Sequence, residues 1–380
     1  MRVAFVHWVI DPVLGAGMAV KTVNVSRALA AAGADVRVVT TDAGLDARAA
    51  PMPGVDVVVL PARGRRFPVP RAPGGTMASL VGDRDVVFLM NHWTAINAMA
   101  VRACWRARVP YGICPGGALR IQGRSRALKQ VYQWMIGHRL LRDASVVLAT
   151  TPLEGRQFET DGIPPARIAV IPNGVDVEPA GATAAAFRAR HLPGDAPFVL
   201  FMGRLNPIKG PDLLLDAFAR VARARPGWQL VFAGRDEGME AGLRDRAAAL
   251  DLADRVRFVG HLDAAMSVGA YRAAALLAVP SRHEAMSQVA LEAAVVGTPV
   301  LLTDACGFDE VGRVGGGGVV APTVDAIAQG LDDLIARPDA LPAMGDALRT
   351  FVAGEYGWPG ITRRYLDLFD RMRARGRATG

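Results

Sequence analysis

Short apolar runs alternate with helical stretches rich in Ala, Leu and Arg from one end of the chain to the other. In the first half the runs cover residues 2–10, 36–42, 55–61, 84–90, 110–114 and 145–151. In the second half they cover residues 198–203, 229–234, 256–260, 275–281 and 298–304. Continuous apolar strands separated by helices predict parallel sheets that are covered on both faces. The expected fold class is therefore α/β with doubly wound sheets.

The strand pattern pauses between Pro172 and Pro197, where Pro, Gly and Ala dominate. A chain of 380 residues is long enough for two domains. We predict an N-terminal domain over residues 1–172, a linker over 173–197, a C-terminal domain over 198–360, and a helix with a frayed tail over 361–380. Each domain is expected to be Rossmann-like. The two should face one another across a cleft that binds ligands at the carboxyl ends of the strands, and the last helix should cross back to the N-terminal domain.

The net charge of +8 comes entirely from the first half of the chain. Residues 1–176 hold 21 Lys and Arg against 12 Asp and Glu, whereas residues 177–380 hold 23 against 24. This asymmetry predicts an anionic partner for the first half: a phospholipid surface, an anionic acceptor or a nucleic acid. A nucleic acid is disfavoured, because the chain shows neither interleaved aromatic residues nor a helix-turn-helix pattern. Only Lys21, Lys129 and Lys209 are lysines, which makes each of them notable in a chain that otherwise uses arginine.

The cysteine and hydropathy patterns argue against a disulfide-rich protein, a CxxC zinc protein and a membrane-spanning protein. Cys104, Cys114 and Cys306 are too few and too scattered for a disulfide framework or a CxxC zinc site. The first ten residues resemble a strand without a small-residue cleavage site, and every apolar run is shorter than the roughly 18 residues of a membrane span. We expect a cytoplasmic protein, soluble or attached peripherally at the inner face of a membrane.

The first chemical signal is the turn GRLNPIKG, which runs from Gly203 to Gly210 between a predicted strand and a predicted helix. A glycine turn at a strand end, with Arg204 and Lys209 five positions apart, can present two cations and several backbone N–H groups to one dianionic group. On spacing alone, a solvated turn with two surface cations remains an equal alternative.

The second signal is a pair of acids, Glu284 at the end of a predicted strand and Glu292 within an apolar helix. Two carboxylates placed in this way can bind hydroxyl groups of a ligand at the N-terminus of that helix. Between them, Ala285, Met286 and Ser287 leave backbone amides free for a phosphate. The alternative is one helix-capping acid and one ordinary ion-paired acid.

A weaker signal lies between the first strand and the first helix. Gly15 and Gly17 resemble the start of a dinucleotide-binding GxGxxG motif, but Val20 occupies the position of the third glycine. The missing glycine argues against NAD, although the segment still permits close approach of a ligand to the backbone.

Together these segments resemble the retaining GT-B glycosyltransferases of the group called glycosyltransferase family four, over nearly the whole chain. IPNGVD is similar to the inter-domain junction of that family, GRLNPIKG to its donor-phosphate turn, and AGRDEG to its AGxGxE-type loop. The run from Val279 to Val311 resembles the E-x7-E signature, with Glu284 and Glu292 as the two acids.

The resemblance implies roles for the donor site. Arg204 and Lys209 would bind the diphosphate of a nucleoside diphosphate sugar, Glu284 would contact the transferred sugar, and Glu292 would contact the ribose. Gly203 and residues 285–287 would complete this site. The loop after the first acid is usually glycine-rich in the family, so Ala-Met-Ser here is a departure.

On the acceptor side the resemblance is less complete. The first loop of the family usually carries two adjacent glycines, and here Gly15 and Gly17 flank an alanine. The family often places a histidine at a strand end near the acceptor. His92 could fill that role or could simply pack beside Trp93. Gly116, followed by a second glycine, resembles the branch that builds bacterial polysaccharides.

The expected function is transfer of a sugar from a nucleoside diphosphate sugar to a hydroxyl of a glycan or lipid-linked acceptor, with retention of configuration, in bacterial polysaccharide or glycoconjugate biosynthesis. We expect Arg204, Lys209 and Glu284 to carry the chemistry without a cofactor or a metal, because the sequence shows no Asp-x-Asp metal site. The alternatives are a sugar-nucleotide epimerase and a non-catalytic sugar-nucleotide binder on the same fold.

The basic half of the chain suggests where a membrane contact could lie. Basic residues gather in the loop with Arg63, Arg65, Arg66 and Arg71 and in the segment 124–142. Such segments fit docking on an anionic lipid or on a pyrophosphate-linked lipid acceptor. A solvated basic face is the equal alternative.

Overall fold

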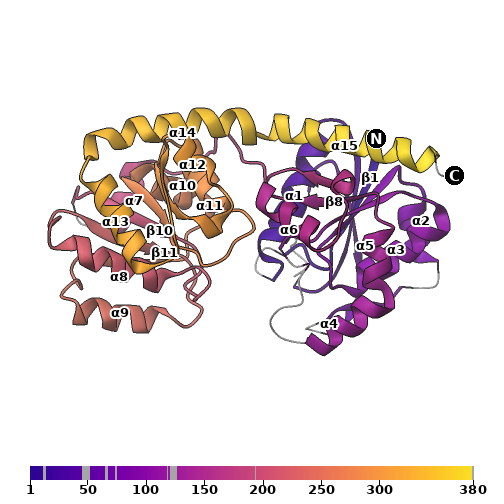
Figure 1. The fold of residues 1–380 in the computed structure, drawn as a ribbon, viewed down its shortest axis with the longest axis horizontal. Helices are drawn as coiled ribbons and strands as arrows, with labels where there is room; N and C mark the ends of the chain where they lie inside the picture. Colours follow the sequence, from indigo (N-terminus) through magenta and orange to yellow (C-terminus); the bar gives the residue numbers. More distant parts are fainter. Residues whose placement is uncertain are drawn as a thin grey trace. The chain divides into compact units, whose positions relative to one another are not determined.

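The computed structural model describes residues 1–11, 14–44, 52–64, 67–72, 75–117, 119, 126–192 and 194–378. The chain forms two compact α/β units, coloured mainly indigo to magenta and magenta to orange in Figure 1. Unit 1 comprises Met1–Gly174 together with Trp358–Gly380, and unit 2 comprises Val175–Gly357. The chain therefore passes from unit 1 to unit 2 and returns at its C-terminal end.

Unit 1 is built on a seven-stranded sheet in which all strand pairs are parallel. In spatial order its strands are β3 (Val55–Leu60), β2 (Asp35–Thr41), β1 (Arg2–Val6), β6 (Val86–Met90), β7 (Tyr111–Cys114), β8 (Val146–Ala149) and β9 (Ile168–Val170). A separate antiparallel pair is formed by β4 (Ala62–Arg63) and β5 (Val69–Pro70).

Helices cover both faces of this sheet, as a doubly wound fold requires. One face packs against α2 (Thr76–Gly82), α3 (Ala95–Ala107), α5 (His138–Arg142) and α6 (Pro152–Thr160), and the other against α1 (Ala16–Ala31) and α15 (Trp358–Ala378). Between β7 and α5 run α4 (Arg126–Tyr132) and the π-helix η1 (Gln133–Gly137), and η2 (Pro165–Arg167) precedes β9.

The inner strand β1 shows why both faces need a cover. Its side chains alternate, so that Ala4 and Val6 join the core under α3, whereas Val3 and Phe5 join the core under α1 and α15. The ring of Phe369 in α15 lies 5.7 Å from that of Phe88 in β6. The last helix thus packs into the N-terminal unit, as expected from the sequence.

Unit 2 repeats the plan with six parallel strands. In spatial order these are β12 (Val256–Gly260), β11 (Gln229–Ala233), β10 (Phe198–Met202), β13 (Leu276–Val279), β14 (Val300–Thr303) and β15 (Gly317–Val320). One face packs against α7 (Ala184–His191), α10 (Ala264–Ala273), α11 (Gln288–Val295) and α14 (Leu341–Tyr356), and the other against α8 (Pro211–Ala222), α9 (Glu240–Ala249) and α13 (Val324–Ile335). The short elements η3 (Asp304–Cys306), α12 (Glu310–Arg313) and η4 (Pro338–Ala340) complete the unit.

The division between the units differs from the one expected. Residues 173–197, predicted to be a linker, lie almost entirely in unit 2 and contain α7. This helix is Ala-rich and has a weak apolar period, but its Phe187 is fully buried and stacks on Phe198 with ring centroids 6.0 Å apart. A single aromatic side chain therefore anchors a helix that the pattern did not reveal. Residues 358–360, expected in the C-terminal domain, begin α15 and belong to unit 1.

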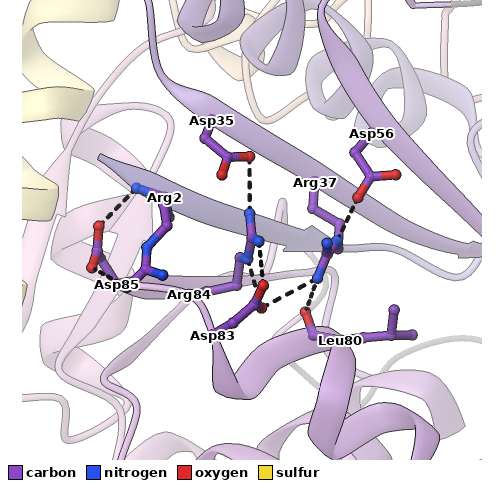
Figure 2. Close-up of polar contacts among 8 residues, drawn as sticks. All are labelled: Arg2, Asp35, Arg37, Asp56, Leu80, Asp83, Arg84 and Asp85. Atoms are coloured by element: carbon purple, nitrogen blue, oxygen red, sulfur yellow. Dashed lines mark hydrogen bonds and ion pairs between the residues drawn. The ribbon is translucent and has the colours of Figure 1, made fainter.

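A network of ion pairs lies at the amino end of the sheet in unit 1, shown in Figure 2. The Arg84 guanidinium, almost fully buried, contacts Asp35 at 3.0 Å and Asp83 at 2.5 Å. Arg37 pairs with Asp56 at 2.6 Å and with Asp83 at 3.2 Å. The network therefore joins β2, β3 and the turn between α2 and β6 at the edge opposite to the carboxyl ends of the strands.

No helix among the described residues combines the length and the apolar character that a membrane crossing needs.

The Arg84 network yields a stability prediction. We expect Arg84→Ala to lower the free energy of unfolding of unit 1 by about 1–2 kcal/mol, because it leaves two half-exposed aspartates without their shared cation. Arg2→Ala is the control: Arg2 is exposed and pairs with Asp85 at 3.3 Å, so its loss should change the free energy by less than about 0.5 kcal/mol. Denaturant unfolding of the three proteins measures both effects.

The same comparison has a pH dependence. The hydrogen bond from Arg84 and its charge hold the pKa of Asp83 at about 2, below its ordinary 3.8. A carboxyl whose pKa is depressed by folding stabilises the fold above its unfolded pKa and loses that contribution as the pH falls. The difference between wild type and Arg84→Ala should therefore be full above pH 4 and shrink toward pH 2, and a difference constant over that range would contradict the assignment.

Candidate functional site

The site predicted in unit 2 forms where strands β10, β11 and β13 end. After β10 the chain turns through residues 203–210 and enters α8. Gly210 begins that helix with φ of +69°, and a Cβ at this position would meet the carbonyl oxygen of Pro280 at 2.2 Å. Only glycine therefore lets this turn close onto the end of β13. The backbone amide of Arg282 then donates to the carbonyl of Ile208 over 2.8 Å, which ties the two loops together.

This closure brings Lys209 to Glu284. Lys209 Nζ lies 2.9 Å from Glu284 Oε1, and the same oxygen accepts a hydrogen bond from Ser281 Oγ over 2.5 Å. The Glu284 side chain is 9% exposed and that of Lys209 is 25% exposed. The structure thus joins two residues predicted from separate motifs, 75 positions apart in the sequence, in one half-buried ion pair.

Arg204 occupies the same edge but has a different partner. Its guanidinium lies 3.0 Å from Glu237, which follows β11, and Asn206 Nδ2 donates to the other Glu237 oxygen over 2.7 Å. The hydrogen bond from Asn206 lowers the pKa of Glu237, and the hydrogen bond and charge of Arg204 lower it further. Glu237 was not predicted as a site residue, although AGRDEG, the loop that contains it, was. One signal could have identified Glu237: it is an acid that follows one predicted strand, while the turn with Arg204 and Lys209 follows another.

Residues 285–287 follow the ion pair and lead into α11. The side chain of Met286 is buried in the core of unit 2, and Ser287 Oγ is buried without a hydrogen-bond partner among the described residues. The backbone amides of Glu284 and Ser287 donate to the carbonyls of Ala305 and Cys306. Their packing leaves Ala285, which is partly exposed, as the member of this segment most open to a ligand.

Glu292 lies on α11, the helix that follows Glu284 in the chain, among mainly apolar residues. Tyr271 donates its hydroxyl to Glu292 Oε2 over 2.9 Å. Burial raises the pKa of Glu292 above its ordinary value, and the hydrogen bonds from Tyr271 and Gln288 act against this rise. The acid is therefore anchored by a partner that the sequence motif does not contain.

In unit 1 the predicted glycines also lie at the carboxyl edge of the sheet. Gly15 caps the N-terminus of α1 and Gly17 lies in its first turn, where a Cβ would meet nothing within 4 Å. A Cβ on Gly116, whose φ is +58°, would meet the sulfur of Met18 at 2.2 Å. The turn after β7 is thus packed against the start of α1, so three of the predicted residues belong to one region.

Two charged residues beside these glycines were not predicted as site residues. Glu154 is 3% exposed, and its two oxygens accept hydrogen bonds from the backbone amides of Gly117, at 2.7 Å, and Thr150, at 2.6 Å. Lys21, which is also buried, donates from Nζ to Thr150 Oγ1 over 2.9 Å. Glu154 therefore fixes the glycine turn to the end of β8. Lys21 was notable in the sequence because the chain has only three lysines, whereas no feature of the sequence pointed to Glu154.

His92 is placed inside the fold. Its ring is fully buried, packs edge-on against Trp93 at 4.4 Å and against Tyr132 at 5.8 Å, and its Nε2 lies 3.1 Å from Gln133 Oε1. Burial lowers the pKa of His92 to about 4, so that the ring is neutral at pH 7. This geometry corresponds to the packing alternative. In this structure His92 supports η1 rather than facing solvent.

The basic loop predicted around Arg63 is described only in part. Arg63 lies in β4 and Arg71 in the stretch after β5, while Arg65 and Arg66 fall outside the described residues. Across the described residues, no group of three or more His, Cys, Asp or Glu side chains is arranged to hold a metal ion.

Two family models match the chain. The glycosyl transferase 4-like domain model covers residues 16–174, and the glycosyl transferases group 1 model covers residues 183–350. These matches correspond to the first part of unit 1 and to most of unit 2.

Among curated proteins, a D-inositol 3-phosphate glycosyltransferase of Kineococcus radiotolerans is 33% identical over 251 residues, which is 60% of this chain and 57% of that enzyme. The enzyme of the same name from Nocardia farcinica is 35% identical over 245 residues, or 60% and 53%. The chain spans little more than half the length of the curated relatives it matches.

Solved structures match over nearly the whole chain. Anabaena HepE in complex with UDP superposes with a TM-score of 0.81 at 18% identity, covering 98% of this chain and 100% of that one. Sucrose-phosphate synthase of Thermosynechococcus elongatus gives 0.76 at 23% identity, covering 98% and 99%. At these identities the likeness concerns the fold, and it confirms the expected fold class.

The carboxylate of Glu154 leads to a prediction for unit 1. Glu154→Ala removes the charged acceptor of two backbone N–H groups, the buried one of Thr150 and the partly buried one of Gly117, so we expect it to lower the free energy of unfolding by about 2–4 kcal/mol. Glu154→Gln keeps one oxygen and should recover part of the loss. Glu159→Ala, an exposed acid on the same helix, is the matched control. Chemical denaturation measures all three, and equal stability of the two alanine variants would show that the carboxylate does not hold the turn.

Proposed function

This chain belongs to the group 1 glycosyltransferases, and we propose that it moves a sugar from a nucleoside diphosphate sugar to a hydroxyl of a glycan or lipid-linked acceptor, with retention of configuration. The observation that carries the proposal is the Lys209–Glu284 ion pair at the end of β13, with Arg204 on the neighbouring loop and Glu292 on the helix that follows. A cation for phosphate and a carboxylate for sugar hydroxyls are thereby held in one place.

The cations serve the leaving group. When the bond to the sugar breaks, negative charge develops on the β-phosphate. Lys209 and Arg204 are fixed charges that stabilise this developing charge without reorganisation. Both are engaged by acids in the free protein, so their side chains are already oriented toward the edge where the diphosphate binds. The N-terminus of α11 adds its positive dipole end.

Glu284 positions the sugar. Its Oε1 is occupied by Lys209 and Ser281, and we assign its Oε2 to a hydroxyl of the transferred sugar. The acceptor hydroxyl then attacks from the face that the diphosphate leaves, and its proton passes to a phosphate oxygen. Glu292 binds the ribose hydroxyls. No step in this scheme requires a cofactor or a metal.

The acceptor belongs to unit 1 in this proposal. The region of Gly15, Gly17 and Gly116, braced by Glu154, is the acceptor-side surface. HepE was solved with UDP, which makes a uridine nucleotide the first donor to test. The basic surface of unit 1 favours an acceptor on or near an anionic membrane, and so a cytoplasmic protein that attaches peripherally, in bacterial polysaccharide or glycoconjugate synthesis.

A thermal-shift panel of nucleoside diphosphates tests the donor assignment. A ligand at about a hundred times its dissociation constant stabilises the fold by roughly 2.7 kcal/mol, which is easily detected. We expect a shift with one base, followed by turnover of its sugar conjugate. Lys209→Ala and Arg204→Ala should each cost about 2–4 kcal/mol of transition-state stabilisation, equivalent to about a 30- to 1,000-fold loss of kcat/KM.

Three outcomes would count against this proposal. If Lys209→Ala turned over substrate as fast as wild type, Lys209 would not bind the donor diphosphate. Interconversion of two sugar nucleotides without transfer would indicate an epimerase. A clear shift without turnover by any acceptor would indicate a non-catalytic binder.

The ribose assignment is tested on Glu292. Glu292→Ala should weaken binding of the free nucleoside diphosphate by about tenfold or more, because a carboxylate that accepts two hydroxyl hydrogen bonds is lost. Tyr271→Phe is the control, since it removes the hydroxyl that anchors Glu292 but keeps the carboxylate. Calorimetric titration compares the two. If both variants bind equally weakly, Glu292 acts through packing with Tyr271 and not on the ribose.

A further inference from the structure

An unusual group of apolar side chains faces solvent on α4 and η1. Among the described residues, seven large apolar side chains are half exposed or more, and four of them lie within eight consecutive positions: Leu128, Val131, Trp134 and Met135. Trp134 is 84% exposed and Met135 is 63% exposed. We call these four residues the outer patch. Exposed apolar side chains scattered singly are normal, but a contiguous group marks a binding surface.

The core of unit 1 does not require the outer patch. The same helical segment already supplies Ile136 and Leu140 to the core of unit 1, and Tyr132 packs against that core. The segment thus carries exposed apolar side chains in addition to its buried ones, which an ordinary surface helix does not. An exposed apolar group that no described residue covers has a role other than folding.

A contact between η1 and the interior of unit 1 fixes the orientation of the helix that carries the outer patch. Gln133 of η1 points inward and its Oε1 lies 3.1 Å from His92 Nε2. Gly137 provides the space for this contact, because a Cβ there would meet Gln133 Oε1 at 2.3 Å. Trp134 and Met135 follow directly in the sequence and face outward. The buried polar contact therefore holds the adjacent apolar pair in solvent.

The charge around the outer patch has one sign. The helices α3, α4, η1 and α5 contain Arg102, Arg106, Arg126, Lys129, Arg139 and Arg142 and no acidic residue. Arg139 and Arg142 are exposed, and both contact Asp143, the acid directly after α5, at 3.0 Å. Together with Asp143, these helices therefore carry five positive charges in excess in their sequence. In Figure 1 α4 lies at the lower end of unit 1, beyond the sheet.

We propose that the outer patch inserts into the interface of an anionic lipid bilayer, with Trp134 and Met135 below the headgroups and the flanking cations among the lipid phosphates. Tryptophan prefers the boundary between headgroups and acyl chains, and cations beside it are attracted by anionic lipid. A soluble anion would not need the apolar side chains, and an apolar protein partner would not need the cations. The inference names the surface for the membrane contact proposed above and rests on that part of the proposed function.

Vesicle binding tests this surface without any sugar substrate, so its failure is distinct from failure of the donor assignment. The full chain is mixed with vesicles of phosphatidylglycerol and phosphatidylcholine in equal parts, and with pure phosphatidylcholine, and co-sedimentation is measured. We expect binding to the anionic vesicles that weakens with salt, and a loss of about tenfold or more in Trp134→Ser/Met135→Ser. The control Leu250→Ser changes an exposed leucine of unit 2 and should bind as wild type.

A second pair of measurements locates the insertion. Wild-type tryptophan emission should shift to shorter wavelength on anionic vesicles. Trp134→Phe should retain most of the binding but lose that shift, because the aromatic ring is kept and the reporter is removed. Sedimentation velocity of wild type and Trp134→Ser/Met135→Ser asks whether a second copy covers the outer patch instead.

The proposal is overturned if wild type does not bind anionic vesicles at low salt, if Trp134→Ser/Met135→Ser binds as wild type, or if the double variant dissolves a dimer present in wild type.

Discussion

All sheet pairs in the two main sheets are parallel, and this one constraint determines where chemistry can occur. Parallel strands point their carboxyl ends at a single edge, and helices close both faces, so polar loops gather at that edge. In unit 2 it holds Lys209, Glu284 and Arg204. In unit 1 it holds the glycine turns and Glu154. The opposite edge of unit 1 holds the Arg84 network, where charges serve stability.

The two units use buried or half-buried charge in different ways. In unit 2 the Lys209–Glu284 pair is reachable by solvent, and a ligand can replace part of each partner's contacts. In unit 1 both oxygens of the Glu154 carboxylate accept hydrogen bonds from backbone amides, and the side chain is buried. The accessible Lys209–Glu284 pair suits a site where a substrate binds and leaves. The buried Glu154 carboxylate suits a structural role, in which it fixes the backbone around it. A lysine in place of the more common arginine suits the accessible pair, because its compact charge shares one carboxylate oxygen with a serine hydroxyl.

Much of this arrangement follows from sequence. Strand runs, the glycine turn and the two spaced acids predicted the sheets and assigned Lys209 and Glu284 to one site, although not their ion pair. The partners that hold the site could not be predicted in the same way, because Glu237, Tyr271 and Glu154 meet their targets only through the sheet order. Helix α7 was not predicted because it buries only one large apolar side chain, Phe187, and so shows little helical periodicity. Strand β15 was not predicted because two of its four residues are glycine. His92 is a different case: its position after a strand left an acceptor-side role and packing beside Trp93 both open, and the structure buries its ring against Trp93 and Tyr132.

The return of α15 to unit 1 bears on how the protein is made. Ile361, Tyr365, Leu368, Phe369 and Met372 belong to the same core as Val3 and Phe5 of the first strand. During synthesis the N-terminal unit emerges from the ribosome first but lacks one covering helix until Trp358–Ala378 have emerged as well. Unit 2 is continuous and has its whole core beforehand. The order of synthesis and the order of completion are therefore reversed, and the first sheet keeps the part of one apolar face that α1 does not cover exposed while the second unit folds.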